Sequence, residues 1–239
     1  MNNPITSNHR QRNILGYNML DLILLFAGLL TTVILTIVFM SDWLVVVCCV
    51  LGIFTVFTQA KCKISTKVFG ALWMAFYIFL AWRNSYYGEV IIYLVLMIPL
   101  YVYGTIHWLG HRDKVGNTVI VRKSLPKSEW VVICVCLVGL GFGTYFLLGF
   151  FNTAQMIAST ISVVLTVLAV YLLARRIKCN QIVFLVNDFE LGFLWLLAIS
   201  AGDLSLIPFV VMCAFFVVYD IYGFFQWTRL EKKQISGDQ

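Results

Sequence analysis

Apolar segments long enough to cross a lipid bilayer follow one another along almost the whole of this 239-residue chain. A membrane-spanning helix requires about 20 mainly apolar residues, and the tight turns at Ser41-Asp42, 152–154 and Gly202-Asp203 divide apolar stretches that are too long for one crossing. Apolar residues make up 61% of the chain and charged residues 12%, so little remains for a soluble domain. We therefore expect an all-α membrane protein with eight spans, at residues 19–40, 43–59, 67–82, 90–108, 129–151, 155–174, 181–201 and 205–227.

Positive charge is distributed unevenly between the two sides of the predicted membrane. With both termini in the cytoplasm, all of the 17 Lys and Arg residues except Arg83 fall on the cytoplasmic side, as the positive-inside rule requires. The net charge of +6 is thus explained by topology, without a nucleic-acid partner. We expect a multi-pass protein of the cell (inner) membrane, with cytoplasmic tails at 1–18 and 228–239 and a cytoplasmic loop at 109–128. The run at 19–40 is too long for a cleaved signal and is expected to remain as an N-terminal anchor helix.

An internal repeat divides the rest of the chain. The motif Y-G-x-x-x-W occurs at Tyr103 to Trp108 and again at Tyr222 to Trp227, and similar basic loops begin at Ala60 and at 174. We expect two parallel three-helix repeats, at 43–108 and 155–227, joined by a connector helix at 129–151. Transporters built from parallel repeats hold their substrate near the midplane between the halves. The alternative is coincidence combined with the usual anchoring of aromatic residues at the membrane interface.

Two acidic residues lie deep inside predicted spans. A charge within a membrane span costs a few kcal/mol and marks a functional site by default. Glu190 and Asp220 are such residues, and the sequence places no Lys or Arg at their depth to serve as a structural partner. Asp21 is expected at a helix start near the inner interface, and Asp188 at an interface if its helix begins late.

Aromatic and polar residues accompany these acids at helical spacing. A pocket with aromatic walls and a few acids suits a flat polar or cationic ring, through stacking, cation–π attraction and hydrogen bonds. For any single aromatic residue, packing or interface anchoring is the alternative. The expected substrate-binding residues are Trp73, Tyr77, Tyr93, Tyr101, Asn187, Glu190, Trp195, Tyr219, Asp220, Tyr222 and Gln226.

No pattern indicates enzymatic chemistry. The seven cysteines contain no C-x-x-C pair, and the sequence shows no phosphate-binding loop and no paired nucleophile and base. His107 and His111 have the spacing of a metal pair, but no third ligand converges on them. We therefore expect no catalytic residue, no metal and no cofactor, and the partners are a small-molecule substrate and the lipid bilayer.

Motifs along the chain resemble the PnuC family of nicotinamide riboside transporters. The residues that carry this resemblance are Gly52, the basic loop at 60–64, Gly70, Tyr77, Tyr87-Gly88-Glu89, Pro99, Gly104, Trp108, Arg122 to Leu125, Trp130, Tyr219, Tyr222-Gly223 and Trp227. The resemblance implies a fold similar to the SWEET transporters, with three helices, a connector and three helices. It also implies facilitated diffusion of this NAD precursor by alternating access, with uptake sustained by a cytoplasmic kinase that phosphorylates the substrate.

The substrate motif of the family is altered here. The family carries W-x-x-W-x-x-x-N, where this chain has Glu190, Phe193 and Leu197, and Asp220 stands where Asn is frequent. Proteins of this fold also carry thiamine, riboflavin or deoxynucleosides, so these substrates and proton coupling stay open as alternatives. A membrane-embedded binding subunit without transport is a further alternative, and a homo-oligomer is possible.

Overall fold

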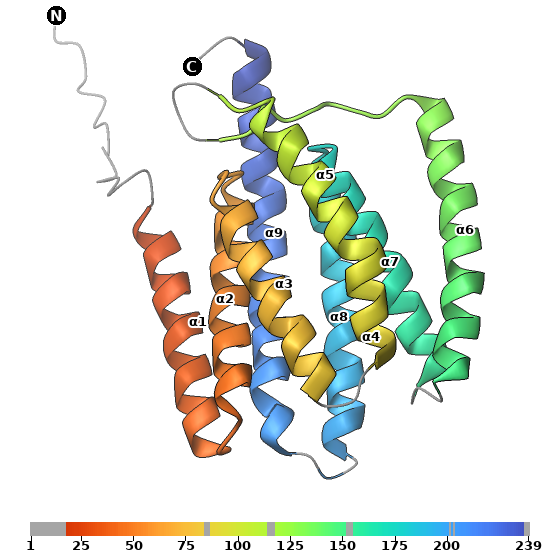
Figure 1. Ribbon diagram of the computed structural model, residues 1–239. Helices are drawn as coiled ribbons and strands as arrows, with labels where there is room; N and C mark the ends of the chain where they lie inside the picture. Colours follow the sequence, from red (N-terminus) through yellow and green to blue (C-terminus); the bar gives the residue numbers. More distant parts are fainter. Residues whose placement is uncertain are drawn as a thin grey trace, which may run out of the picture.

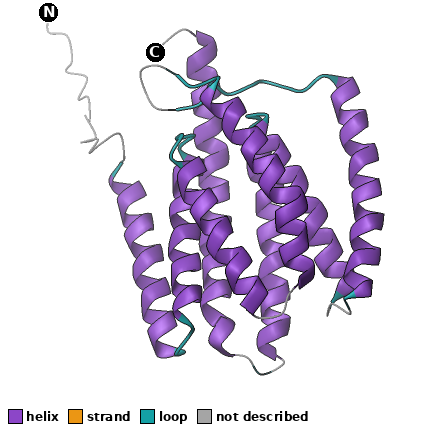
Figure 2. Ribbon diagram, viewed as in Figure 1, coloured by secondary structure: helices purple, strands orange, loops and turns teal. Residues whose placement is uncertain are grey.

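The computed structural model is all-helical over the residues that it describes (Figures 1 and 2). These are residues 18–83, 87–113, 118–151, 155–200, 202 and 204–236, without the side chains of 87–89 and 198. The predicted turn at 152–154, Asp203, the first 17 residues of the cytoplasmic tail and the side chain of Glu89 therefore lie outside the description.

The helices follow the predicted order along the chain. They are α1 (Met19–Val38), α2 (Trp43–Ala60), α3 (Thr66–Arg83), α4 (Tyr87–Ile92), the π-helical turn η1 (Tyr93–Met97), α5 (Ile98–Leu109), α6 (Lys127–Phe150), α7 (Met156–Ala174), α8 (Asn180–Ser200), the 3₁₀ turn η2 (Leu204–Leu206) and α9 (Ile207–Ser236). The last helix continues well into the segment 228–239 that was expected to be a tail.

Six of the described helices are long and apolar enough to cross a membrane: α1, α2, the continuous α4–η1–α5 segment, α6, α7 and α9. α3 and α8 are not in this group. α3 includes Lys67 and Arg83 among its 18 residues. Both helices nevertheless run alongside the other six, α3 against α2 and α8 between α7 and α9 (Figure 1). The prediction of an all-helical multi-span protein is thus confirmed, and the count of eight spans stays a prediction.

The fourth span contains a local change of helix type. Pro99 has no N–H and cannot bond to the carbonyl four residues earlier, and the turn before it widens so that the Ile98 N–H donates to the Tyr93 carbonyl. Such π-helical turns recur at functional sites. This one lies where Tyr93 and Met97 line a cavity.

One end of the bundle carries the turn at 61–65, the described parts of a loop at 110–113 and 118–126, and the turn at 175–179; we call it the basic end. The two turns have the same form, because Cys62 and Arg176 both have positive φ, at 54° and 62°. The loop is hydrogen-bonded to both turns: the Val119 N–H donates to the Cys62 carbonyl at 3.0 Å, and the Arg122 N–H to the Arg176 carbonyl at 2.9 Å. The loop therefore ties the two turns together.

Two tryptophans close the bundle just below the basic end. Trp108 of α5 donates from Nε1 to the Leu173 carbonyl of α7 at 2.7 Å, and Trp227 of α9 donates to the Gln59 carbonyl of α2 at 2.9 Å. Both indoles are fully buried, with ring centroids 6.0 Å apart. Each of these hydrogen bonds joins a helix of the predicted repeat 43–108 to a helix of the predicted repeat 155–227.

Lys67, the first residue of the predicted span 67–82, lies inside the bundle. It is the second residue of α3 and is buried. Its ammonium group lies over the rings of Tyr101, at 4.8 Å, and Trp108, at 4.5 Å. Cation–π attraction of this kind compensates for part of the lost hydration.

At the edges of the bundle lie α1 and α6 (Figure 1). α1 packs against α2 and α9, where the largest apolar core cluster includes Leu25, Ile53 and Met212. α6 packs mainly against α7. The helices between these two edges surround the cavity.

Candidate functional site

A cavity of about 170 Å³ lies among α2, α3, the α4–η1–α5 segment, α7, α8 and α9. Seven of the predicted site residues line it: Trp73, Tyr77, Tyr93, Tyr101, Asn187, Trp195 and Asp220. The other four, Glu190, Tyr219, Tyr222 and Gln226, are not part of its lining.

Three aromatic rings form one wall of the cavity. Trp73 and Tyr77, one turn apart on α3, stack with centroids 5.2 Å apart. Tyr93, in the π-helical turn, packs against both, at 4.8 Å from Tyr77 and 6.3 Å from Trp73. A second aromatic pair lines the cavity from other helices, where Trp195 of α8 stacks on Phe209 of α9 at 4.8 Å with an interplanar angle of 12°. A flat ring between these two walls would have aromatic faces available for stacking.

Polar groups gather where α8 meets α9 and α7. The Asn187 carbonyl oxygen accepts from the Thr166 hydroxyl at 3.0 Å. Asp188 and Asp220 both line the cavity, and the two residues are only 5% and 2% exposed. Gln181, with its amide nitrogen facing Asp220, donates to Asp220 Oδ1 at 3.0 Å and accepts from Trp227 Nε1 at 3.1 Å. The cavity therefore has a carboxyl pair in its wall.

Asp188 is a cavity residue for which an interfacial position was expected if its helix began late. Because α8 begins at Asn180, Asp188 lies eight residues into the helix, roughly 12 Å along it. It lines the cavity together with its neighbour Asn187. The argument applied to Glu190 and Asp220, an acid deep in a span without a basic partner, applies equally to Asp188, because the predicted span 181–201 begins within one residue of α8.

Three polar atoms of lining residues have no hydrogen-bond partner among the described residues. They are the Trp73 Nε1 and Trp195 Nε1 donors, one on each aromatic wall, and the Asp220 Oδ2 acceptor. Buried polar groups are normally paired, and exceptions require an explanation such as a missing ligand. These atoms provide two donors and one anionic acceptor for a polar ligand.

Glu190 and Tyr219 lie outside the cavity lining. Both carboxylate oxygens of Glu190 are buried without a hydrogen-bond partner in the described part of the chain, and Ser162, a lining residue, interacts with this carboxylate. Tyr219 is buried with its ring edge-on to Phe57 at 6.1 Å, within the core cluster shared by α1, α2 and α9. Glu190 is thus adjacent to the lining, whereas Tyr219 packs in the core.

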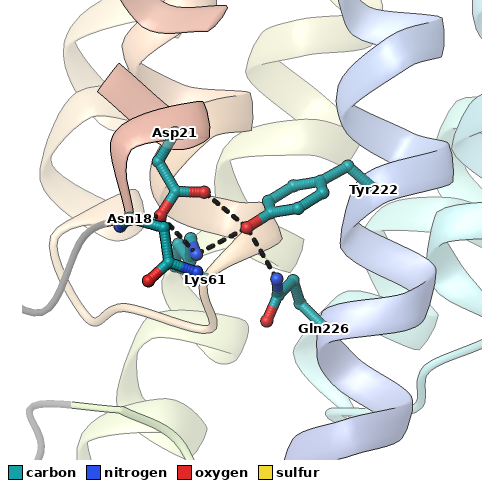
Figure 3. Close-up of polar contacts among 5 residues, drawn as sticks. All are labelled: Asn18, Asp21, Lys61, Tyr222 and Gln226. Atoms are coloured by element: carbon teal, nitrogen blue, oxygen red, sulfur yellow. Dashed lines mark hydrogen bonds and ion pairs between the residues drawn. The ribbon is translucent and has the colours of Figure 1, made fainter. Parts of the chain in front are cut away.

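Tyr222 and Gln226 belong to a different polar cluster, which holds α1 against α2 and α9 (Figure 3). The Tyr222 hydroxyl donates to Asp21 and accepts from Lys61 Nζ at 2.7 Å and from Gln226 Nε2 at 2.6 Å. Lys61 Nζ and Asp21 Oδ2 form an ion pair at 2.7 Å, in which the Asp21 side chain is 0% exposed. Asp21 also accepts from the Asn18 N–H at 2.6 Å, so it caps the start of α1 as expected. Tyr222 and Gln226 therefore help to hold α1 against α2 and α9, and they do not line the cavity.

Within the described residues, no group of three or more His, Cys, Asp and Glu side chains could hold a metal ion. At the basic end, burial raises the pKa of the Cys62 thiol well above its usual value, so this cysteine stays neutral and unreactive. The arrangement is suited to reversible binding of an organic ring.

Comparisons with known proteins agree with this geometry. A family model described as nicotinamide mononucleotide transporter matches residues 42–229. The chain is 26% identical over 217 residues to the nicotinamide riboside transporter PnuC of Neisseria mucosa, covering 88% of this chain and 81% of that protein. It is 24% identical over 200 residues to PnuC of Haemophilus influenzae, with 81% and 82% covered. The crystal structure of the vitamin B3 transporter PnuC matches with a TM-score of 0.77 and 22% identity, over 91% of this chain and 94% of that chain, which shows a shared fold.

Proposed function

Since this chain belongs to the nicotinamide mononucleotide transporter family, we propose that it carries nicotinamide riboside across the cell membrane through the cavity between α3 and α8. The names of the two PnuC relatives state this substrate. The observation that carries the proposal is the cavity itself, with its two aromatic walls and its carboxyl pair. No step of catalysis is needed for this function.

The chemistry of nicotinamide riboside fits these walls. Its pyridinium ring is flat and positively charged, so it stacks on indole and phenol rings with cation–π attraction. The stacked pair Trp73 and Tyr77 and the stacked pair Trp195 and Phe209 offer such faces. The free Nε1 donors of the two tryptophans suit the carboxamide and ribose oxygens, and Asp220 suits the ring charge.

The proposed membrane architecture has eight spans, with α3 and α8 crossing beside the six apolar helices. Their 18 and 21 residues correspond to lengths of roughly 27 and 32 Å, enough for the hydrocarbon core. α2, α3 and α4–α5 form one repeat, α7, α8 and α9 the other, α6 the connector and α1 the extra helix. The reciprocal contacts Trp108 to Leu173 and Trp227 to Gln59, together with the matching turns at Cys62 and Arg176, support this arrangement.

Transport then proceeds by alternating access between the two repeats, with both termini and the basic end in the cytoplasm. The buried indoles Trp108 and Trp227 donate to the carbonyls of Leu173 and Gln59, two residues that line the cavity. Opening on that side separates helices of different repeats. We propose that phosphorylation of the substrate in the cytoplasm sustains net uptake, because it lowers the concentration of free substrate on that side.

The test is uptake of labelled nicotinamide riboside into proteoliposomes containing the purified protein. Trp73→Ala removes half of a stacked pair and a free donor, and we expect it to lower uptake at least tenfold. Trp130→Ala is the matched control, because Trp130 lies on α6, away from the cavity lining, and is 37% exposed. Absence of uptake by the unmodified protein contradicts the proposal, and binding without uptake indicates a binding subunit.

A second substrate class is favoured by the carboxyl pair of Asp188 and Asp220. Thiamine carries a cationic thiazolium ring and would use the same walls and the same charge. Riboflavin and deoxynucleosides could stack on the same walls, but they are neutral and would not use the charge. Competition of labelled nicotinamide riboside uptake by thiamine, riboflavin and thymidine therefore ranks the alternatives. Stronger inhibition by thiamine than by unlabelled nicotinamide riboside reassigns the substrate.

A further inference from the structure

Gln181 joins the cavity wall to the basic end of the bundle. It is the second residue of α8 and is 1% exposed, and it is not part of the cavity lining. Its amide donates to Asp220 Oδ1 at 3.0 Å and accepts from Trp227 Nε1 at 3.1 Å. These two partners are about two turns apart on α9, so they lie on one face of that helix. One buried amide therefore bridges a carboxylate that lines the cavity and an indole near the basic end.

The Trp227 indole continues this series of hydrogen bonds across the bundle. Its Nε1 also donates to the Gln59 carbonyl of α2 at 2.9 Å, so one N–H is shared between two acceptors, as in a three-centre hydrogen bond. Gln59 belongs to the proposed first repeat, whereas Gln181, Asp220 and Trp227 belong to the second. A continuous series of hydrogen bonds thus runs from the cavity wall to a contact between the two proposed repeats.

Gly223 leaves the space that the Gln181 amide occupies. It lies between the two partners on α9, one turn after Asp220 and one turn before Trp227. A Cβ at Gly223 would be 2.9 Å from the Gln181 Cδ, and 3.0 and 3.1 Å from the two polar atoms of the amide group. These distances are shorter than ordinary contacts between carbon atoms. Any side chain at Gly223 would therefore displace the amide from its two partners.

The same arrangement recurs in the proposed first repeat. Lys67 is the second residue of α3, and its ammonium group lies 4.8 Å from the ring centroid of Tyr101 and 4.5 Å from that of Trp108. A Cβ at Gly104, between these two aromatic residues on α5, would be 3.4 Å from Lys67 Nζ. The three α5 residues each stand 119 positions before their counterparts Asp220, Gly223 and Trp227. In both halves, the second residue of the middle helix thus connects a cavity-lining residue to the buried tryptophan.

Asp220 is the point at which a ligand would act on this series. Gln181 occupies its Oδ1, while its buried Oδ2 has no hydrogen-bond partner among the described residues. A ligand that binds Oδ2 leaves the bond to Gln181 in place and restricts rotation of the carboxylate. Hydrogen bonds in series also polarise and strengthen one another. An occupied site therefore favours the arrangement in which Trp227 reaches Gln59.

We propose that Gln181 is a positioning residue that couples substrate binding at Asp220 to closure of the basic end. This inference rests on the proposed function and deepens it, because it assigns the step that follows binding to a residue outside the cavity. Binding stabilises the closed basic end, and closure in turn raises the affinity for substrate by the same factor. Couplings between two sites are typically about fivefold to 150-fold. A single series of hydrogen bonds belongs at the lower end of that range.

Cys62 provides a native reporter of opening at the basic end. It is buried in the apolar cluster that also contains Trp108 and Trp227, so N-ethylmaleimide reaches its thiol only when that cluster opens. Cys179, at the same end, is partly exposed and packs in a different cluster, and it serves as the internal reference. The full-length protein in proteoliposomes is labelled with and without nicotinamide riboside, and mass spectrometry follows each cysteine. We expect saturating nicotinamide riboside to slow labelling of Cys62 about fivefold relative to Cys179.

Two variants break the connection at different residues. Gln181→Met keeps an unbranched side chain of similar length but removes both hydrogen bonds, and Gly223→Ala displaces the Gln181 amide. Each should reduce the effect of the ligand on Cys62 to less than about twofold, and the double variant should behave like Gln181→Met alone. Gly143→Ala on α6 is the matched control and should retain the full effect, since a Cβ there meets no atom within 4 Å. The saturating concentration is set by a binding titration of each variant, so weaker binding alone does not remove the effect.

A purely structural role of Gln181 gives a different result. Loss of packing alone would speed labelling of Cys62 by the same factor with and without ligand, so the ratio of the two rates would stay as in the unmodified protein. That ratio, retained in Gln181→Met, overturns the coupling, and ligand binding by this variant shows that it is folded even if Gly223→Ala is not. Binding of nicotinamide riboside to the unmodified protein without slower labelling of Cys62 also overturns it. Both results leave the proposed substrate intact, whereas a protein that does not bind nicotinamide riboside refutes both proposals.

Discussion

The ion pair between Lys61 and Asp21 allows a quantitative test of how α1 is held. Lys61 is 11% exposed and Asp21 is fully buried, with Nζ and Oδ2 at 2.7 Å. Removing one partner of a buried pair costs about 3–5 kcal/mol, because the other charge stays buried without compensation. In Lys61→Met, Asp21 still accepts from Tyr222 and from the Asn18 N–H (Figure 3). We therefore expect the lower end of this range, a loss of about 3 kcal/mol in the free energy of unfolding.

A double-mutant cycle that adds Asp21→Asn and the double variant distinguishes a true ion pair from two independent side chains. Asp21→Asn keeps an acceptor for Tyr222 but leaves the Lys61 ammonium unpaired. Because Lys61 can extend to water from its partly exposed position, this change should cost less, about 2 kcal/mol. In the double variant neither charge is left unpaired, so its cost should fall below the sum of the two by at least about 2 kcal/mol.

The free energies come from reversible unfolding in mixed micelles with increasing dodecyl sulfate, followed by far-ultraviolet circular dichroism. The control pair is Arg83 and Asp42, which is also at 2.7 Å but is 52% and 31% exposed. An exposed pair contributes about 0–1 kcal/mol, so Arg83→Met should have little effect. The reasoning is refuted if Lys61→Met costs no more than Arg83→Met, or if the two changes at Lys61 and Asp21 are additive.

Three further variants test contacts inside the bundle. A Cβ at Gly70 would lie 2.1 Å from the Tyr101 hydroxyl oxygen, so Gly70→Ala should destabilise the protein by about 1–3 kcal/mol, measured by thermal unfolding, and no change would contradict this packing. Trp227→Phe removes the bond to the Gln59 carbonyl and should cost about 1 kcal/mol by the same assay, the net worth of one hydrogen bond, because this carbonyl still accepts from the Cys62 N–H at 2.9 Å. Trp73→Phe keeps an aromatic ring but removes the free Nε1 donor, and we expect the Kd for nicotinamide riboside to rise roughly fivefold, the equivalent of about 1 kcal/mol; an unchanged Kd would exclude that donor from the site.

The order and type of the helices could be predicted because the signal is local. An apolar run ends where Ser41 and Asp42 interrupt it, and α2 then begins at Trp43, with the Asp42 side chain accepting from the Leu44 N–H at 3.0 Å. Helix capping of this kind depends only on neighbouring residues. Pro99 is also a local signal: it predicted where the helix would be interrupted, but not that the interruption would be a π-helical turn.

Which of the predicted residues line the cavity depends on how each helix is rotated about its axis. The identity of the polar residues alone does not give this rotation. Successive residues of a helix are separated by about 100°, so Tyr222 lies about 200° around α9 from Asp220. With Asp220 in the cavity wall, Tyr222 and Gln226, one turn apart, face α1 and α2 instead. The spacing alone could have separated these residues into two faces. It could not have shown which face met the cavity, since that depends on packing against other helices.

Trp73, Tyr77 and Tyr93 were predicted from spacing and do line the cavity. Their relation to one another was not predictable, because it depends on how the π-helical turn directs Tyr93 toward α3. Asp188 was missed for a different reason: it was assigned to an interface if its helix began late, although the predicted span 181–201 begins within one residue of α8 and already contains it.

The motif Y-G-x-x-x-W identified two similar segments, and the structure supplies the role of its tryptophans. Trp108 and Trp227 each reach the first helix of the other proposed repeat, at Leu173 and at Gln59. Separating the repeats toward the basic end would therefore break both bonds together. The loop segment at 118–126, bonded to both turns, would have to move with them. A transition that breaks several contacts at once is two-state in character, and this coupling makes opening at the basic end a single concerted step in the proposed transport cycle.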